Sequence, residues 1–365
     1  MIASDSEVMG EDSQERRAPA MRTRLTFSDN SVTQSYLKWS LSMSPVALFL
    51  APLALVGAGA LAFAIPLAQP LEPPPPLASV HQGALAIDRE GMPDLSRFQA
   101  RDGTSLAYRL YPAANAATDR VAILVHGSSG TSAGANAAAK ALAAAGVTAV
   151  AIDARGHGAS GTRGDIGYIG QLDDDLADLV AELRKSYPTA KLELIGHSAG
   201  GGFVARIAAG PMASQFERFI LLAPYLGYRA PTNLPNEGSG RWVSVDLPRV
   251  VALSVLANFG VDWAQSLPTL AFAVEPEARK SGTPYYSYRL MTNFASPLDW
   301  KAPFLASRGK MVVIVGEDDE LMNAPAYRAA LEPLGASVTL LPGVDHMGIA
   351  YRPAALDALV AAVKL

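Results

Sequence analysis

Residues 196–200 read Gly-His-Ser-Ala-Gly, and this pentapeptide constrains the fold more than any other stretch of the chain. The largely apolar run 192–195 before it predicts the end of a buried strand, and residues 203–209 after it are compatible with a helix. A serine on a tight strand-to-helix turn has strained backbone angles, and flanking glycines let neighbouring chain pass close to it. The pattern therefore predicts a nucleophile elbow that presents the Ser198 hydroxyl. A glycine-rich turn with an exposed serine is the alternative.

Strand and helix patterns alternate on both sides of this turn. A hairpin is expected over residues 98–111, turning at Asp102-Gly103. Further strands are expected at 121–125, 147–152, 219–222, 311–315 and 338–341, and helices at 133–145, 172–183 and near the end of the chain. Such alternation predicts an α/β fold with a mostly parallel sheet and helices on both faces. In this architecture functional groups gather at the carboxyl ends of the strands.

Residues 225–300 interrupt the alternation and are rich in proline, glycine and aromatic residues. We interpret this stretch as an insertion that caps the strand ends. Most of its large aromatic side chains are expected in the core of the cap and a minority along an apolar substrate pocket. They are Trp242, Phe259, Trp263, Tyr285, Tyr286, Tyr288, Phe294 and Trp300.

A serine nucleophile needs a base that takes its proton, and the chain has five histidines. His81 falls in a proline-rich region, and His126 and His157 sit in glycine-flanked loops where a structural hydrogen-bonding role is expected. His197 is locked in the elbow beside the nucleophile and is expected to point elsewhere. His346 follows the last expected strand, so it is the candidate base.

The acid that orients this base should follow the preceding strand. Residues 316–320 read Gly-Glu-Asp-Asp-Glu and offer four carboxylates at that position. Asp319 is the first choice and Asp318 the second. The resulting order along the chain, serine then aspartate then histidine, is the order of one particular fold.

The chain resembles the α/β-hydrolase fold, and within it the lysophospholipase and monoglyceride lipase-like group, also called serine aminopeptidase S33-like. The resemblance covers about residues 98–365. Five motifs carry it: His-Gly-Ser-Ser-Gly at 126–130, Asp-Ala-Arg-Gly-His-Gly at 153–158, the elbow at 196–200, Gly-Glu-Asp-Asp at 316–319 and Gly-Val-Asp-His at 343–346.

The resemblance implies Ser198 as nucleophile, His346 as base and Asp319 as orienting acid. It also implies an oxyanion hole formed by the backbone N–H groups of Ser128 and Ala199. We therefore expect an ester hydrolase that works through an acyl-enzyme and needs neither a metal nor an organic cofactor. A peptidase or amidase with the same triad and a catalytically silent binding protein are the alternatives.

The first hundred residues follow a different pattern. Residues 1–42 are polar and expected to be disordered, residues 43–68 contain an uncharged apolar run long enough to cross a bilayer, and residues 69–96 form a proline-rich spacer. Arg22, Arg24 and Lys38 precede the run, so we expect a single-pass anchor with the catalytic domain outside the cytoplasm. A signal peptide cleaved near residues 62–64, a start at Met21 or Met43, and a buried core helix are the alternatives.

Composition narrows the possible partners. The chain of 365 residues has a formal net charge of −4 and no basic stripe, which argues against nucleic acid. It has no cysteine, which excludes disulfides and thiolate chemistry. The expected partners are an apolar or lipid ester as substrate and a membrane contacted through residues 45–68; the oligomeric state is left open.

Overall fold

The computed structural model describes residues 45–114, 119–234, 242–280 and 282–365. The segment 1–42 that the sequence predicts as disordered lies outside them. The chain divides into two compact units, Met1–Ala62 and Phe63–Leu365. All residues discussed below as the site belong to the second unit.

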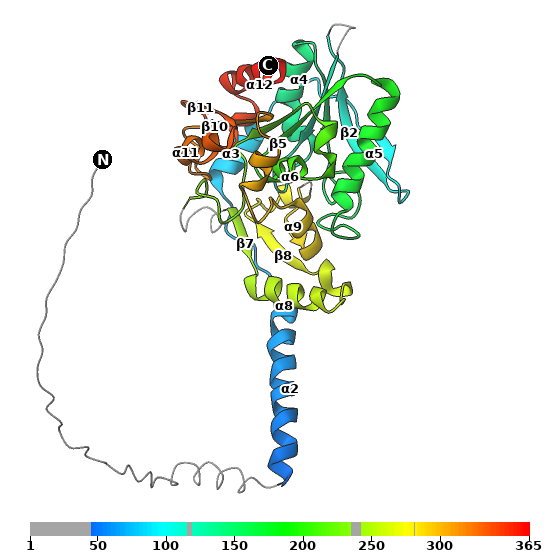
Figure 1. The fold of residues 1–365 in the computed structure, drawn as a ribbon, viewed down its shortest axis with the longest axis vertical. Helices are drawn as coiled ribbons and strands as arrows, with labels where there is room; N and C mark the ends of the chain where they lie inside the picture. The colour runs from blue at the N-terminus through cyan, green and yellow to red at the C-terminus, as the bar shows by residue number, and fades with distance from the viewer. Residues whose placement is uncertain (1–44, 115–118, 235–241, 281) are drawn as a thin grey trace, which may run out of the picture. The chain divides into compact units, whose positions relative to one another are not determined.

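An eight-stranded sheet forms the centre of the second unit (Figure 1). Its spatial order is β1-β2-β4-β3-β5-β6-β10-β11; β1–β2 and β2–β4 pair antiparallel and the remaining pairs are parallel. The strands are β1 Ser96–Gln99, β2 Ser105–Tyr111, β3 Arg120–Val125, β4 Thr148–Ile152, β5 Lys191–His197, β6 Arg218–Leu222, β10 Met311–Gly316 and β11 Ser337–Leu341. The predicted mostly parallel sheet is confirmed, and the hairpin turns at Gly103, which has a positive φ of 81°.

Helices pack on both faces of this sheet. Helix α4 (Asn136–Ala144) and helix α12 (Pro353–Lys364) lie side by side and share one apolar cluster, in which Leu142 and Leu359 are buried. Helices α5 (Gln171–Ser186) and α6 (Ala199–Ala208) contribute to the cluster on the other face. Central strands such as β3 and β10 are therefore covered on both sides, which explains their uninterrupted apolar sequences.

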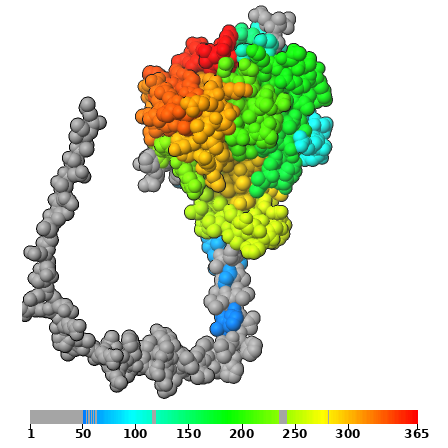
Figure 2. All heavy atoms as spheres, in the orientation of Figure 1, coloured from blue at the N-terminus to red at the C-terminus, as the bar shows by residue number. Residues whose placement is uncertain are grey.

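The insertion between β6 and β10 contains a second, smaller sheet and several helices. It contains β7 Val243–Val245, α8 Leu247–Asn258, β8 Pro268–Phe272, β9 Tyr285–Ser287, α9 Tyr288–Phe294 and α10 Ala302–Ala306. Strands β7, β8 and β9 make an antiparallel sheet, and the part of the insertion around α8, yellow-green in Figure 2, lies at one end of the unit.

The aromatic residues of this cap divide into two groups. Tyr286 and Phe294 are buried as expected, at 2% exposure each. Phe259 and Trp263 are 80% and 79% exposed, so these two belong to neither of the expected groups, the cap core and the pocket wall. Phe259 caps the C-terminal end of α8, and Trp263 begins the short 3-10 helix that follows it.

The stretch predicted as a membrane anchor or signal sequence is helical, as α2 (Pro45–Ala68). A membrane span is not supported by the structure, because within its described residues no helix is both long enough and apolar enough to cross a bilayer. The C-terminal end of α2 is bound by Arg249 of α8, whose Nε donates to the carbonyl oxygen of Pro66 over 3.0 Å.

The predicted spacer 69–96 is not uniformly extended. Residues Ala78–Ala86 form helix α3, which the sequence analysis does not predict. The helix has nine residues, a glycine in its interior and no side-chain cap, so its local propensity is low. Tertiary packing within the second unit, in which Val80 and Gly83 are buried, stabilises it instead.

Candidate active site

Ser198 occupies the turn between β5 and α6 with φ 54° and ψ −121°, a positive φ that non-glycine residues rarely adopt. Its N–H donates to the Leu222 carbonyl over 2.9 Å and fixes the turn to the neighbouring strand. A Cβ at Gly196 would lie 2.3 Å from the Gly200 oxygen, and one at Gly200 would lie 2.3 Å from the His126 oxygen. Both glycines are therefore required by close backbone contact.

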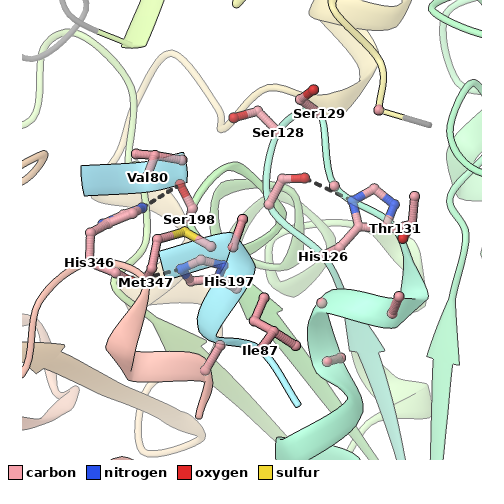
Figure 3. A pocket seen from close by; sticks show the side chains of 18 of the residues that line it. Val80, Ile87, His126, Ser128, Ser129, Thr131, His197, Ser198, His346 and Met347 are labelled. Carbon is pink, nitrogen blue, oxygen red and sulfur yellow. Dashed lines mark hydrogen bonds between the residues drawn. The ribbon is translucent and has the colours of Figure 1, made fainter. Parts of the chain in front are cut away.

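The structure brings the predicted base to this serine (Figure 3) and the predicted acid to the base. His346 Nε2 lies 3.1 Å from Ser198 Oγ, and His346 Nδ1 lies 2.8 Å from Asp319 Oδ2. Asp319 follows β10 and His346 follows β11, so the sheet places both at the edge where β5 ends. The carboxylate is itself held, because Asp319 Oδ1 accepts the N–H groups of Leu321 and Met322 over 2.9 Å.

The surroundings of His346 favour its charged form. Burial lowers the pKa of this imidazole, but the adjacent Asp319 carboxylate outweighs burial and the net pKa is raised above its ordinary value. Asp319 is 8% exposed, whereas Asp318 is exposed and its N–H donates to the Val344 carbonyl. The structure thus joins Asp319, and not Asp318, to the histidine.

The other histidines of the region take supporting positions. His197 Nε2 lies 3.2 Å from the carbonyl oxygen of His346, and burial lowers the pKa of His197 to about 3, so it is neutral and donates this bond. His157 Nε2 lies 2.6 Å from the Tyr286 hydroxyl, and His126 Nε2 accepts the Ala154 N–H over 3.2 Å. The sequence predicts that His197 points away from the nucleophile and indicates no partner for its ring; the structure gives it the backbone carbonyl of His346.

The loop 126–130 passes directly beside the elbow. A Cβ at Gly127 would lie 3.2 Å from Ser198 Cβ. Two cap residues hold this loop: Trp242 Nε1 donates to Ser128 Oγ over 2.8 Å, and the Tyr286 hydroxyl accepts the Ser129 N–H over 2.9 Å. The oxyanion role of the Ser128 and Ala199 N–H groups stays a prediction. No sequence signal predicts that aromatic residues of the cap hold this loop.

A pocket of about 350 Å³ opens at Ser198 and His346. Ser128 also lines it, and most of its wall is apolar. Apolar side chains from the sheet, the cap, the segment before the sheet and the loop after β11 line it, among them Leu124, Val125, Ile195, Leu222, Trp242, Val274, Val80, Ala84, Ile87 and Met347. Within the residues that the structure describes, no group of three or more histidines and acids is arranged to hold a metal ion.

The sequence of the chain is similar to a known family and to a known lipase. Residues 116–349 match the model of the family described as serine aminopeptidase, S33. The monoacylglycerol lipase of Mycolicibacterium smegmatis (strain ATCC 700084 / mc(2)155) is 24% identical over 247 residues, which cover 62% of this chain and 80% of that protein.

Solved structures agree on the fold. A soluble variant of the monoglyceride lipase of Saccharomyces cerevisiae, in complex with a substrate analog, superposes with a TM-score of 0.53 at 16% identity, covering 76% of this chain and 95% of that one. The monoacylglycerol lipase of Paleococcus ferrophilus gives a TM-score of 0.51 at 18% identity, covering 70% and 99%. These likenesses confirm the α/β-hydrolase fold, and the family match extends over most of the catalytic unit.

Proposed function

Because this chain belongs to the serine aminopeptidase S33 family of α/β hydrolases, we propose that it cleaves carboxylic esters by acyl transfer to Ser198. In this proposal His346 is the general base and Asp319 orients it. The observation that carries the proposal is the chain of contacts from Asp319 through His346 to Ser198 Oγ, at 2.8 and 3.1 Å. A serine hydroxyl becomes nucleophilic when a positioned base can take its proton, and these distances are within hydrogen-bond reach.

The reaction proceeds in two halves. Ser198 Oγ attacks the ester carbonyl while its proton passes to His346 Nε2, and the backbone N–H groups of Ser128 and Ala199 bind the oxyanion. His346 then protonates the alcohol oxygen as the C–O bond breaks, leaving an acyl-enzyme. Water, deprotonated by His346, attacks the acyl carbon, and the proton returns to Ser198 as the carboxylic acid leaves. Each oxyanion donor contributes about 3 kcal/mol of transition-state stabilisation.

The apolar pocket next to Ser198 supports a lipid-like ester as substrate. Burying a methylene group contributes about 0.8 kcal/mol, so an acyl chain gains affinity from such a wall without further polar groups. The named relatives act on monoacylglycerol or monoglyceride, which are esters of this class. We therefore place esters of apolar acyl chains first among the candidate substrates.

A fluorophosphonate probe tests the nucleophile. The wild-type protein should be labelled, and Ser198→Ala should not be labelled while its circular dichroism spectrum stays unchanged. A folded wild-type protein that resists the probe would refute the proposed function and leave the silent binding protein as the better interpretation.

A second comparison separates esterase from peptidase. Turnover of p-nitrophenyl esters of increasing chain length should exceed turnover of aminoacyl anilides by at least about tenfold in kcat/KM. The reverse ranking would retain Ser198 as nucleophile and replace the ester with an amide as the substrate bond.

We also propose, from the sequence, that residues 45–68 attach the protein to a membrane with the catalytic unit outside the cytoplasm. The support is the absence of charge over these residues and the basic residues Arg22, Arg24 and Lys38 before them. Protease added to spheroplasts should digest the catalytic unit. Protection of that unit would place it on the cytoplasmic side, and release into the medium would indicate a cleaved signal sequence.

A further inference from the structure

Residues 77–89, here called the N-terminal wall, lie against the active-site pocket although they precede the catalytic sheet by several residues. Val80, Ala84 and Ile87 line the pocket that also contains Ser198 and His346. Figure 3 shows Val80 and Ile87 facing the same space as the catalytic pair. The wall lies outside residues 116–349, the part matched by the family model.

The wall packs closely on the residue next to the base. A Cβ at Gly83 would lie 2.3 Å from Met347 Cβ, so α3 approaches the loop after β11 as closely as a glycine allows. Val80 and Ile87 are buried, at 8% and 7% exposure. The wall is therefore packed beside His346 and is not a solvent-exposed linker.

Polar contacts fasten both ends of the wall to different parts of the catalytic unit. At one end the Leu77 N–H donates to the carbonyl oxygen of Ala273 in the cap over 3.3 Å. At the other end Asn136 Nδ2 of α4 donates to the Asp88 carbonyl over 2.7 Å, and Lys140 Nζ lies 3.2 Å from the Asp88 carboxylate. The segment thus bridges the cap and α4 across the mouth of the pocket.

We propose that the N-terminal wall binds the acyl chain of the substrate and sets the chain length that the enzyme prefers. The inference rests on the proposed ester hydrolysis and adds a binding subsite to it. An acyl chain attached to Ser198 Oγ would pack between the sheet side of the pocket and the side chains of Val80, Ala84 and Ile87. Each methylene accommodated there raises kcat/KM by about fourfold, and the series stops where the wall blocks the chain.

Substitution of Ala84 tests the proposal. Ala84→Trp places a large side chain in the pocket, so kcat/KM for the longest ester accepted by the wild type should fall at least about tenfold, while the butyrate ester changes less than about threefold. Leu85→Trp is the matched control, because Leu85 neighbours Ala84 on the same helix and is 65% exposed. It should leave the whole chain-length profile unchanged.

Ile87→Ala tests the opposite change and covers the case in which Ala84→Trp does not fold. It enlarges the pocket and should move the preferred chain length upward. Equal effects of either substitution on short and long esters would overturn the proposal. If the wild type hydrolyses no ester, the labelling rates of short-chain and long-chain alkyl fluorophosphonates still show whether the wall binds an alkyl chain. A failure of the wall proposal can therefore be distinguished from a failure of the proposed function.

Discussion

The two sides of the pocket are built by different kinds of interaction. On the catalytic side, Ser198, Asp319 and His346 follow three strands of one sheet, and hydrogen bonds of 2.8 and 3.1 Å join their side chains. The N-terminal wall, residues 77–89, contains the nine-residue helix α3, packs through apolar side chains, and is fastened by polar contacts at its two ends.

This difference predicts that the catalytic side determines the turnover rate and that the wall determines which substrate is preferred. Side chains fixed by a hydrogen-bond network act on the reacting atoms, so changes on the catalytic side should lower turnover of every substrate alike. The wall contacts the part of the substrate that does not react, so changes there should alter the ranking of substrates. The following predictions test this division from the largest expected effect to the smallest.

Asp319→Asn should reduce kcat by about 10⁴-fold for all esters, because an amide can no longer orient His346 or stabilise its charged form. Steady-state turnover of short and long p-nitrophenyl esters measures the effect. Asp318→Asn is the control, since the Asp318 side chain is exposed and lies one residue away. A larger loss in Asp318→Asn than in Asp319→Asn would contradict the assignment of the acid.

Tyr286→Phe should lower kcat by about 10-fold to 100-fold, although Tyr286 belongs to the cap. Its hydroxyl accepts the Ser129 N–H and contacts His157, so its loss frees the loop that carries the predicted oxyanion donor. The expected loss is smaller than removal of a donor itself, because Tyr286 acts only by positioning. It should be equal for short and long esters.

Tyr288→Phe is the matched control for this substitution. Tyr288 is also buried in the cap and its hydroxyl lies 3.0 Å from Ser254 Oγ, away from the oxyanion loop. Its loss should leave kcat within about twofold of the wild type. If Tyr286→Phe changed only the preference for chain length, the cap would belong with the wall and not with the catalytic side.

The catalytic side was largely predictable from the sequence, because each of its residues follows a recognisable strand. The Gly-x-Ser-x-Gly turn, the acids after one strand and the histidine after the next each follow an apolar run that forms a strand. Parallel strands place such residues at one edge, so their proximity follows from the fold class. Asp319 and Asp318 differ by burial, which only the packed structure decides.

The wall was not predictable, because its position depends on contacts between distant residues. Helix α3 has weak local propensity, and nothing in its sequence indicates packing against Met347. The same limit applies to the cap, where Trp242 and Tyr286 form hydrogen bonds to the loop 126–130 while Trp263 is exposed. Aromatic composition alone does not distinguish these positions.

The midpoint of the pH profile of kcat/KM should not differ between the wild type and variants of the wall, because it depends on the catalytic side alone. His346 must be neutral to accept the Ser198 proton, and its pKa is raised, so kcat/KM should fall about tenfold per pH unit below a midpoint that lies above 6.5. The midpoint should be the same for all esters and for the wall variants Ala84→Trp and Ile87→Ala. A midpoint below 6.5, or one that moves with acyl length, would contradict this assignment.

Stability should change in the opposite direction over the same pH range. Because folding raises the pKa of His346, the stabilisation from its pairing with Asp319 is fully present below pH 6.5 and is lost as the pH rises through the folded pKa. The free energy of unfolding of Ser198→Ala should therefore fall by at most about 1.4 kcal/mol per pH unit from this group. Urea unfolding of Ser198→Ala and of Ser198→Ala with His346→Gln from pH 5.5 to 9 measures the contribution of His346 as the difference between the two slopes, because the buried Glu193, whose pKa burial raises to about 7, also titrates in this range. Equal slopes for the two variants would assign the proton to another group, whereas a shallower fall without His346 identifies the charge that stabilises the folded site as the one that limits turnover in acid.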